Sequence, residues 1–128
     1  MDKKRVLIVD DDEKFQALIR AFLETDNGYD LLILSGAKDI LSHVHSFKPD
    51  VILLDLLMPN IGGIEICEML NGDPLGKSIP IIVISALGND TDRLYAYKQG
   101  VVDFLTKPSS RDEMIKAIQK ALSYKENK

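Results

Sequence analysis

Each of four short apolar runs in this 128-residue chain ends at a side chain that could do chemistry. Two runs end in carboxylates, one in a hydroxyl and one in an amine; the residues are Asp10, Asp11, Asp55, Ser85 and Lys107. Carboxylate oxygens suit Mg²⁺, which prefers oxygen ligands and keeps waters that a phosphate can replace. Three carboxylates and one ammonium sum to a formal charge of about −2, which a divalent cation balances. The residue types therefore indicate a magnesium site.

Asp55 stands between the apolar residues 51–54 and 56–58, a setting in which an unpaired charge is costly. A carboxylate can act as a nucleophile toward phosphorus, and the transferred group then needs its oxygens neutralised. The cation, the Lys107 ammonium and the Ser85 hydroxyl could each neutralise one of those oxygens. The set therefore favours phosphoryl-group chemistry at Asp55.

A parallel sheet would bring these side chains together. Apolar runs alternate with longer stretches of helical period, a pattern typical of βαβ units in an α/β fold. The predicted strands are residues 5–9, 31–34, 51–54, 81–84 and 102–105. In such sheets ligands bind outside the carboxyl ends of the strands, so we expect the polar residues at those ends on one rim. Asp103 interrupts the last run and indicates an edge strand.

Helical periodicity predicts the layers that cover the sheet. The first helix should face the core with Phe15, Leu18, Ile19, Phe22 and Leu23, the second with Ile40, Leu41, Val44 and Phe47, and the fifth with Met114, Ile115, Ile118, Ala121 and Leu122. The third should begin after Gly62-Gly63. The fourth should follow residues 89–92 and stop at Gly100, and the fifth should follow Ser109-Ser110.

Composition narrows the class of protein. The length and a hydrophobic content of 45% suit one domain over residues 1–128 with its own core. A net charge of −4 gives no basic footprint, so we expect no direct contact with nucleic acid. There is no apolar window long enough for a membrane span, and no signal peptide is predicted. The lone Cys67 suits a cytoplasmic, reducing location.

Cys67 is expected in the core. His43 and His45 do not share a helix face and are expected at the surface.

The polar motifs, in this order, strongly resemble those of the receiver domain of two-component response regulators. They are Val9-Asp10-Asp11, Leu54-Asp55-Leu56-Leu57-Met58-Pro59, Ser85-Ala86 and Lys107-Pro108. Their spacing is also similar, with 45 residues from Asp10 to Asp55, 30 more to Ser85 and 22 more to Lys107. The resemblance covers nearly the whole chain. It implies a doubly wound, flavodoxin-like sheet of five parallel strands in the order 2-1-3-4-5, with helices on both faces, as in chemotaxis regulators.

This resemblance implies a phosphorylation switch. Asp55 would accept a phosphoryl group from a phosphohistidine on a sensor histidine kinase or a histidine phosphotransfer protein, in a Mg²⁺-dependent transfer. Asp11, Asp55 and the main-chain carbonyl of Leu57 would bind the metal, and Asp10 would assist through water. The domain would assist its own phosphotransfer and dephosphorylation, and so would not be an enzyme in the ordinary sense.

The resemblance also implies how the signal is transmitted. Lys107 would pair with the phosphoryl group, Ser85 would move to hydrogen-bond it, and Phe104 would turn inward. These changes would reshape the face made by the predicted fourth helix, fifth strand and fifth helix, where an output domain or downstream protein would bind. The peptide before Pro108 is expected to be cis.

Several residues depart from the commonest receiver pattern. Gly62 stands where Asp is common, Ser109 where Phe is frequent, and Phe104 where Tyr is commoner. We expect a looser loop, a different anchoring of the last helix, and an inward state of Phe104 that is easier to populate. Leu57 and Leu87 should flank the phosphoryl group without orienting an attacking water, which predicts slow loss of phosphate.

Taken singly, the same residues fit structural roles. An Asp after a strand is often a helix cap, and Asp12 is expected to cap the first helix. Ser85 alone would be a turn residue and Lys107 alone a solvated lysine. Only the complete set favours a phosphoryl site.

Other functions compete with the phosphorylation switch. A magnesium-dependent phosphohydrolase of the haloacid dehalogenase type also uses an Asp nucleophile, but Lys14 stands where its motif needs Thr or Val, and the chain leaves no room for a cap. A flavodoxin-like nucleotide binder needs a phosphate loop where this chain has acids, and no P-loop motif is present. A receiver-like interaction module that is never phosphorylated is disfavoured because every acceptor-site residue is present.

Overall fold

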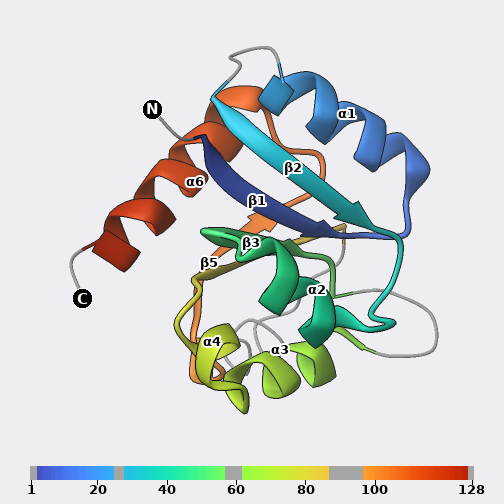
Figure 1. The fold of residues 1–128 in the computed structure, drawn as a ribbon. Helices are drawn as coiled ribbons and strands as arrows, with labels where there is room; N and C mark the ends of the chain where they lie inside the picture. The colour runs from blue at the N-terminus through green and yellow to red at the C-terminus, as the bar shows by residue number, and fades with distance from the viewer. Residues whose placement is uncertain (1–2, 25–27, 57–61, 87–96, 127–128) are drawn as a thin grey trace.

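The computed structural model of the chain describes residues 3–24, 28–56, 62–86 and 97–126. Its centre is a sheet of five parallel strands in the order β2-β1-β3-β4-β5 (Figure 1). The strands are β1 (Lys4–Val9), β2 (Tyr29–Leu34), β3 (Val51–Leu54), β4 (Ile81–Ser85) and β5 (Val101–Thr106). The α/β class, the predicted strands and their order are confirmed, although β1, β2, β4 and β5 are each longer than predicted.

Strand register places the ends of the strands side by side. Val9, the last residue of β1, lies opposite Leu34 of β2 and Leu54 of β3. Ser85 at the end of β4 lies opposite Thr106 at the end of β5. The residues that follow these strands therefore share one rim of the sheet, as the sequence predicts.

Helices cover both faces of the sheet (Figure 1). On one face, α1 (Glu13–Glu24) and α6 (Arg111–Glu126) pack against β-strand side chains such as Ile8, Leu53 and Ile84. On the other, α2 (Ile40–Phe47) and α3 (Gly63–Asn71) pack against the alternate side chains, with the short α4 (Pro74–Lys77) alongside. Since both faces are covered, β3 and β4 are buried throughout, which explains their continuous apolar runs.

The predicted helix faces are mostly confirmed. Phe15, Ile19 and Leu23 of α1 are buried, but Leu18 is 39% exposed, so its expected place in the core is wrong. Leu18 lies beside the line of Phe15, Ile19 and Leu23, which are spaced by four residues, and so stands at the edge of the buried face of α1. Cys67 is buried in the core as predicted, and burial raises the pKa of its thiol to about 12.

The helix α4 was not predicted, and residues next to it in the sequence start it. The Asp73 carboxylate accepts the N–H groups of Leu75 and Gly76 at 3.1 and 2.8 Å, and Pro74 takes the first helical position. The exposed His45 ring places Nε2 2.9 Å from Asp73 Oδ1, and this contact lowers the pKa of Asp73. The surface position expected for His45 is confirmed.

The fourth predicted helix lies mostly outside the described residues. Residues 97–98 are helical, and Gly100 adopts a φ of 89°, which only glycine adopts readily. Within the part of the chain that the structure describes, no helix combines the length and apolar composition that a membrane crossing requires.

Candidate functional site

Three carboxylates meet at the carboxyl rim of the sheet. The ladder of backbone hydrogen bonds continues one residue past the strands: Asp10 N–H donates to Leu34 O and Asp55 N–H donates to Val9 O, each at 3.0 Å. Asp10 and Asp55 are buried, whereas Asp11 is exposed. One carboxylate oxygen from each of these three residues lies within 4.8 Å of the others.

Lys107 brings an ammonium to this acid cluster. Its Nζ lies 2.7 Å from Asp10 Oδ2, 3.4 Å from Asp55 Oδ2 and 4.0 Å from Asp12 Oδ2. The ammonium also lies 4.4 Å from the centroid of the Phe15 ring. In this state, therefore, the lysine is paired more closely with Asp10 than with the predicted acceptor Asp55.

Backbone contacts fix the segment that carries Lys107. Its N–H donates to Ser85 O at 2.9 Å, which ties the segment after β5 to the end of β4. The peptide between Lys107 and Pro108 is cis, as predicted. The lysine side chain is 13% exposed, so its charge is largely removed from water.

Burial and pairing shift the pKa values of the closest pair. Burial raises the pKa of Asp10, although the Lys107 ammonium and the N–H of Asp12 act in the opposite direction. Burial acts to lower the pKa of Lys107, but its contacts with Asp10 and Asp55 outweigh that effect and raise it. Lys107 is thus a firmly held cation at neutral pH, and the Asp10 carboxylate is held there at a free-energy cost.

The donor set fits a divalent cation. Asp10 Oδ1 accepts the N–H of Asp12 at 2.8 Å, whereas the buried Oδ2 lies 2.7 Å from the Lys107 ammonium. Three hard oxygen donors beside one cation leave negative charge that Mg²⁺ would balance. The predicted ligand Leu57 lies outside the described residues.

The two predicted switch residues are both buried. Ser85 is fully buried at the end of β4, and Phe104 of β5 is 8% exposed and packs on the α2 and α3 face of the sheet. Asp103 lies at a register shift between β4 and β5, and β5 is an edge strand as predicted. Leu87 lies outside the described residues, so its place beside the phosphoryl group remains a prediction.

The elements that flank the site are capped locally. Asp12 caps α1 as predicted, because its Oδ1 accepts the N–H groups of Lys14 and Phe15. Before α6, Ser110 and Glu113 exchange side-chain to backbone hydrogen bonds at 3.2 and 3.1 Å. Ser109 is buried and its hydroxyl donates to Thr106 O at 2.7 Å, so it anchors the start of this helix by a hydrogen bond.

Sequence reasoning missed contributions to the site from α1. The Gln16 side-chain amide donates to the carbonyl of Asp10 and to Ser35 Oγ, which ties α1 to the ends of β1 and β2. The Phe15 ring lies against the Lys107 ammonium, although its sequence position indicated only a core residue. The available signal for the Gln16 contact was its spacing of six residues from Asp10, across the turn between β1 and α1.

Known proteins are similar to this chain in sequence and in fold. The model of the response regulator receiver domain family matches residues 6–119. Protein PilH of Pseudomonas aeruginosa is 32% identical over 119 residues, which cover 93% of this chain and 98% of PilH. The alkaline phosphatase synthesis transcriptional regulatory protein PhoP of Bacillus subtilis is 35% identical over 118 residues, which cover 90% of this chain and 48% of PhoP. This chain thus spans about half the length of PhoP.

A solved structure agrees with these sequence relatives. The receiver domain of the Francisella response regulator 1452 superimposes with a TM-score of 0.83 at 31% identity, covering 95% of this chain and 98% of that one. The structural similarity thus extends over nearly the whole of both chains.

Proposed function

This chain belongs to the response regulator receiver domain family, and on that basis we propose that it is a switch activated by phosphorylation of Asp55. Receiver domains are phosphoacceptors rather than enzymes in the ordinary sense, and they bind Mg²⁺ at an acidic pocket. One observation carries the proposal: the oxygens of three carboxylates lie within 4.8 Å of one another, beside the ammonium of Lys107.

Asp55 is the nucleophile in this proposal. One of its carboxylate oxygens forms a bond to phosphorus while the bond from phosphorus to the imidazole nitrogen of a phosphohistidine breaks, and the imidazole leaves with the electron pair. The donor is a sensor histidine kinase or a histidine phosphotransfer protein. Because Asp55 is buried yet stands at the rim, electrostatic contacts around it are strong while a donor can still approach.

Two sources of positive charge surround the transferred group. Asp10, Asp11 and Asp55 would hold Mg²⁺, with the Leu57 carbonyl as a further ligand, and the bound ion would neutralise phosphoryl oxygens. Lys107 supplies the second charge. Its ammonium is already 3.4 Å from Asp55, so a small displacement away from the Asp10 carboxylate brings it to the new phosphoryl group.

Ser85 and Phe104 transmit the change in this proposal. Ser85 ends β4 next to Thr106 of β5, so movement of its hydroxyl toward the phosphoryl group alters the packing between β4 and β5. Phe104 of the neighbouring strand β5 is already buried, so a change in the packing between β4 and β5 would move its side chain. An output domain or a downstream protein would bind the face made by the predicted fourth helix, β5 and α6. The predicted cytoplasmic location belongs to this proposal.

Phosphoryl transfer from acetyl phosphate tests the proposal. The chain is incubated with acetyl phosphate and Mg²⁺, and its intact mass is measured with and without acid treatment. We expect one acid-labile phosphoryl adduct, which requires Mg²⁺ and is lost in Asp55→Asn. Absence of an adduct, or an adduct that persists in Asp55→Asn, would contradict the proposal.

Asp112→Asn is the matched control for this experiment. It removes the same charge from an exposed position in the first turn of α6, outside the acid cluster. This variant should be phosphorylated like the wild type. Turnover of a small phosphate ester in place of a stable adduct would instead favour a phosphohydrolase.

A further inference from the structure

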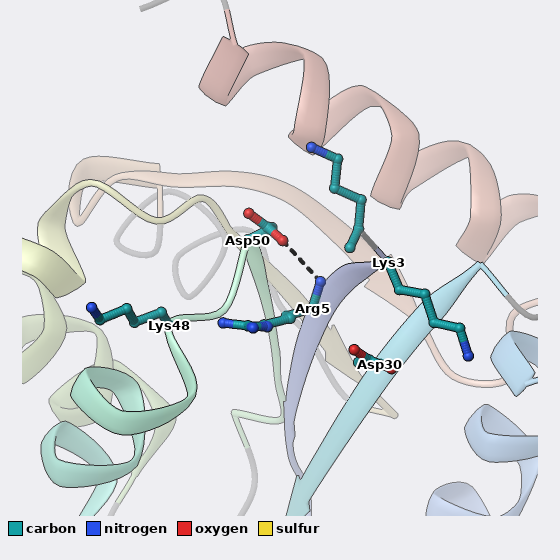
Figure 2. Close-up of a pocket in the computed structure, with 6 residues that line it drawn as sticks. Lys3, Arg5, Asp30, Lys48 and Asp50 are labelled. Atoms are coloured by element: carbon teal, nitrogen blue, oxygen red, sulfur yellow. Dashed lines mark hydrogen bonds between the residues drawn. The ribbon is translucent and has the colours of Figure 1, made fainter. Parts of the chain in front are cut away.

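A charged cleft opens at the rim of the sheet opposite to Asp55. Its lining consists of Lys3, Lys4, Arg5, Asp30, Lys48 and Asp50 (Figure 2). Its volume of about 430 Å³ falls in the range of small-molecule sites. Asp50 precedes β3 and Asp55 follows it. Because a strand rises by about 3.3 Å per residue, the cleft lies about 16 Å from the acid cluster.

This cleft has a net positive charge, whereas the whole chain has a net negative charge. The whole protein has 20 acidic and 16 basic residues, whereas the cleft lining has four cations and two carboxylates. The cations come from separate elements, since β1 supplies Lys4 and Arg5 and the end of α2 supplies Lys48. Folding therefore gathers positive charge here from residues more than forty positions apart.

Arg5 is held in place by the neighbouring elements. Its backbone N–H donates to Asp50 Oδ2 at 2.8 Å, and its Nη1 donates to Phe47 O at 3.1 Å. The guanidinium also lies 6.0 Å from the centroid of the Phe47 ring, and its side chain runs toward Lys48 in Figure 2. A fixed, planar group with several N–H donors suits the paired oxygens of a phosphate.

Lys48 has an unusual backbone conformation. It closes α2 by donating its N–H to Val44 O at 2.9 Å, and its φ of 53° and ψ of 63° lie in the left-handed region. Glycine or asparagine usually fills such a position, because a longer side chain is strained there. The attraction of a cation to the carbonyl end of α2 accounts for part of this choice. It does not account for the other cations on the same rim.

We propose that this cleft binds a small phosphorylated molecule that also carries hydroxyl groups. Arg5 and Lys48 would contact the phosphate oxygens, because Arg5 Nη1 donates to the carbonyl of Phe47, the residue that precedes Lys48 at the end of α2. Asp30 is exposed in the same lining and would accept hydrogen bonds from the hydroxyl groups. A polar cleft of this size suits such a ligand better than an extended acidic peptide, which needs a longer surface.

Titration with ADP and with inorganic pyrophosphate, in Mg²⁺-free buffer, tests this inference. Amide chemical shifts of Lys4, Arg5 and Lys48 are followed by NMR. We expect saturable changes at these residues, with ADP bound more tightly than pyrophosphate. In Lys48→Gly the affinity for both should fall about tenfold, the usual effect of losing one charge-assisted hydrogen bond.

Two variants separate the possible outcomes. Glycine relieves the backbone strain at position 48, so Lys48→Gly should stay folded and a loss of binding reports the missing charge. Lys38→Gln removes the same charge from an exposed site after β2 and should bind both ligands normally. Equal affinities in wild type and Lys48→Gly, no saturable shift, or tighter binding of a polyglutamate peptide would overturn the proposal. Unchanged affinities in Asp55→Asn would separate this result from the phosphorylation proposal.

Discussion

The two ends of the sheet carry opposite charge in opposite surroundings. At the carboxyl end, Asp10 and Asp55 are buried and share one cation, Lys107. At the amino end, four cations line an open cleft, and each is exposed. Buried charges interact strongly and shift each other's pKa values, whereas exposed charges are screened by water. Changes at the carboxyl end should therefore alter stability and metal affinity, and changes at the amino end should alter ligand affinity with little effect on folding.

Removal of carboxylates from the acid cluster should have the largest effect. In Asp11→Asn the affinity for Mg²⁺ should fall about tenfold or more, because one charge-assisted ligand is lost. The double variant Asp10→Asn with Asp11→Asn should lose about a hundredfold. Calorimetric titration with MgCl₂ measures both, with Asp112→Asn, at an exposed position of α6, as the control. An affinity that stays the same in the double variant would place the cation elsewhere.

Removal of the shared cation should have an effect of similar size, on stability rather than on metal affinity. Lys107→Met leaves the Asp10 carboxylate buried without its partner, so the free energy of unfolding should fall by about 3 kcal/mol at neutral pH without Mg²⁺. Urea denaturation followed by circular dichroism measures it. Lys120→Met, on the exposed face of α6, is the control and should change stability by less than about 0.5 kcal/mol. Equal stability of the two variants would refute the importance of the buried pair.

The raised pKa of Asp10 predicts that removing this carboxylate stabilises the protein, by less than the stability that Lys107→Met should lose. A carboxyl group whose pKa is higher in the folded state binds more protons when folded, so its contribution to stability is present below its ordinary pKa of 3.8 and is lost as pH rises through the folded value. At neutral pH without Mg²⁺, Asp10→Asn should therefore be more stable than the wild type by about 1 kcal/mol.

Denaturation at several pH values checks this prediction. The gain in Asp10→Asn should shrink below the ordinary pKa of aspartate and should also shrink when Mg²⁺ is added, because the cation stabilises only the wild-type carboxylate. A variant that is less stable than the wild type at every pH would show that pairing with Lys107 outweighs burial.

The backbone at the amino end should give the smallest effect. Lys48→Gly should stabilise the protein by about 0.5–1 kcal/mol, because glycine adopts the left-handed conformation without strain. Asp39→Gly is matched to it, since Asp39 also has a positive φ of 57°. Its gain should be smaller, because aspartate tolerates that region better than lysine. Thermal melts measure both, and a destabilised Lys48→Gly would argue that the lysine side chain supports the fold.

The sequence predicted the sheet and the acid cluster because both depend on short, local patterns. Apolar runs ending in Asp10 and Asp55 define strands and place carboxylates at their ends. Patterns cannot show which partner a side chain prefers. Lys107 lies closer to Asp10 than to Asp55 because of the path of the chain after β5, which depends on tertiary packing.

Two further features had weaker sequence signals. Asp73 followed by Pro74 is a helix start signal, but four residues are too few to show a helical period, and so α4 was missed. Leu18 was placed in the core because periodicity gives a helix face but not how far the sheet extends beneath it. The basic cleft joins residues of β1, β2 and the end of α2, which no local pattern links.

Identification of the phosphorylated residue tests the central claim most directly. After incubation with acetyl phosphate and Mg²⁺, borohydride reduces an acyl phosphate to an alcohol, so the modified aspartate becomes homoserine and can be located by peptide mass mapping. The account predicts homoserine at position 55 and at neither Asp10 nor Asp11. Homoserine at position 10 or 11, or at no aspartate, would contradict it.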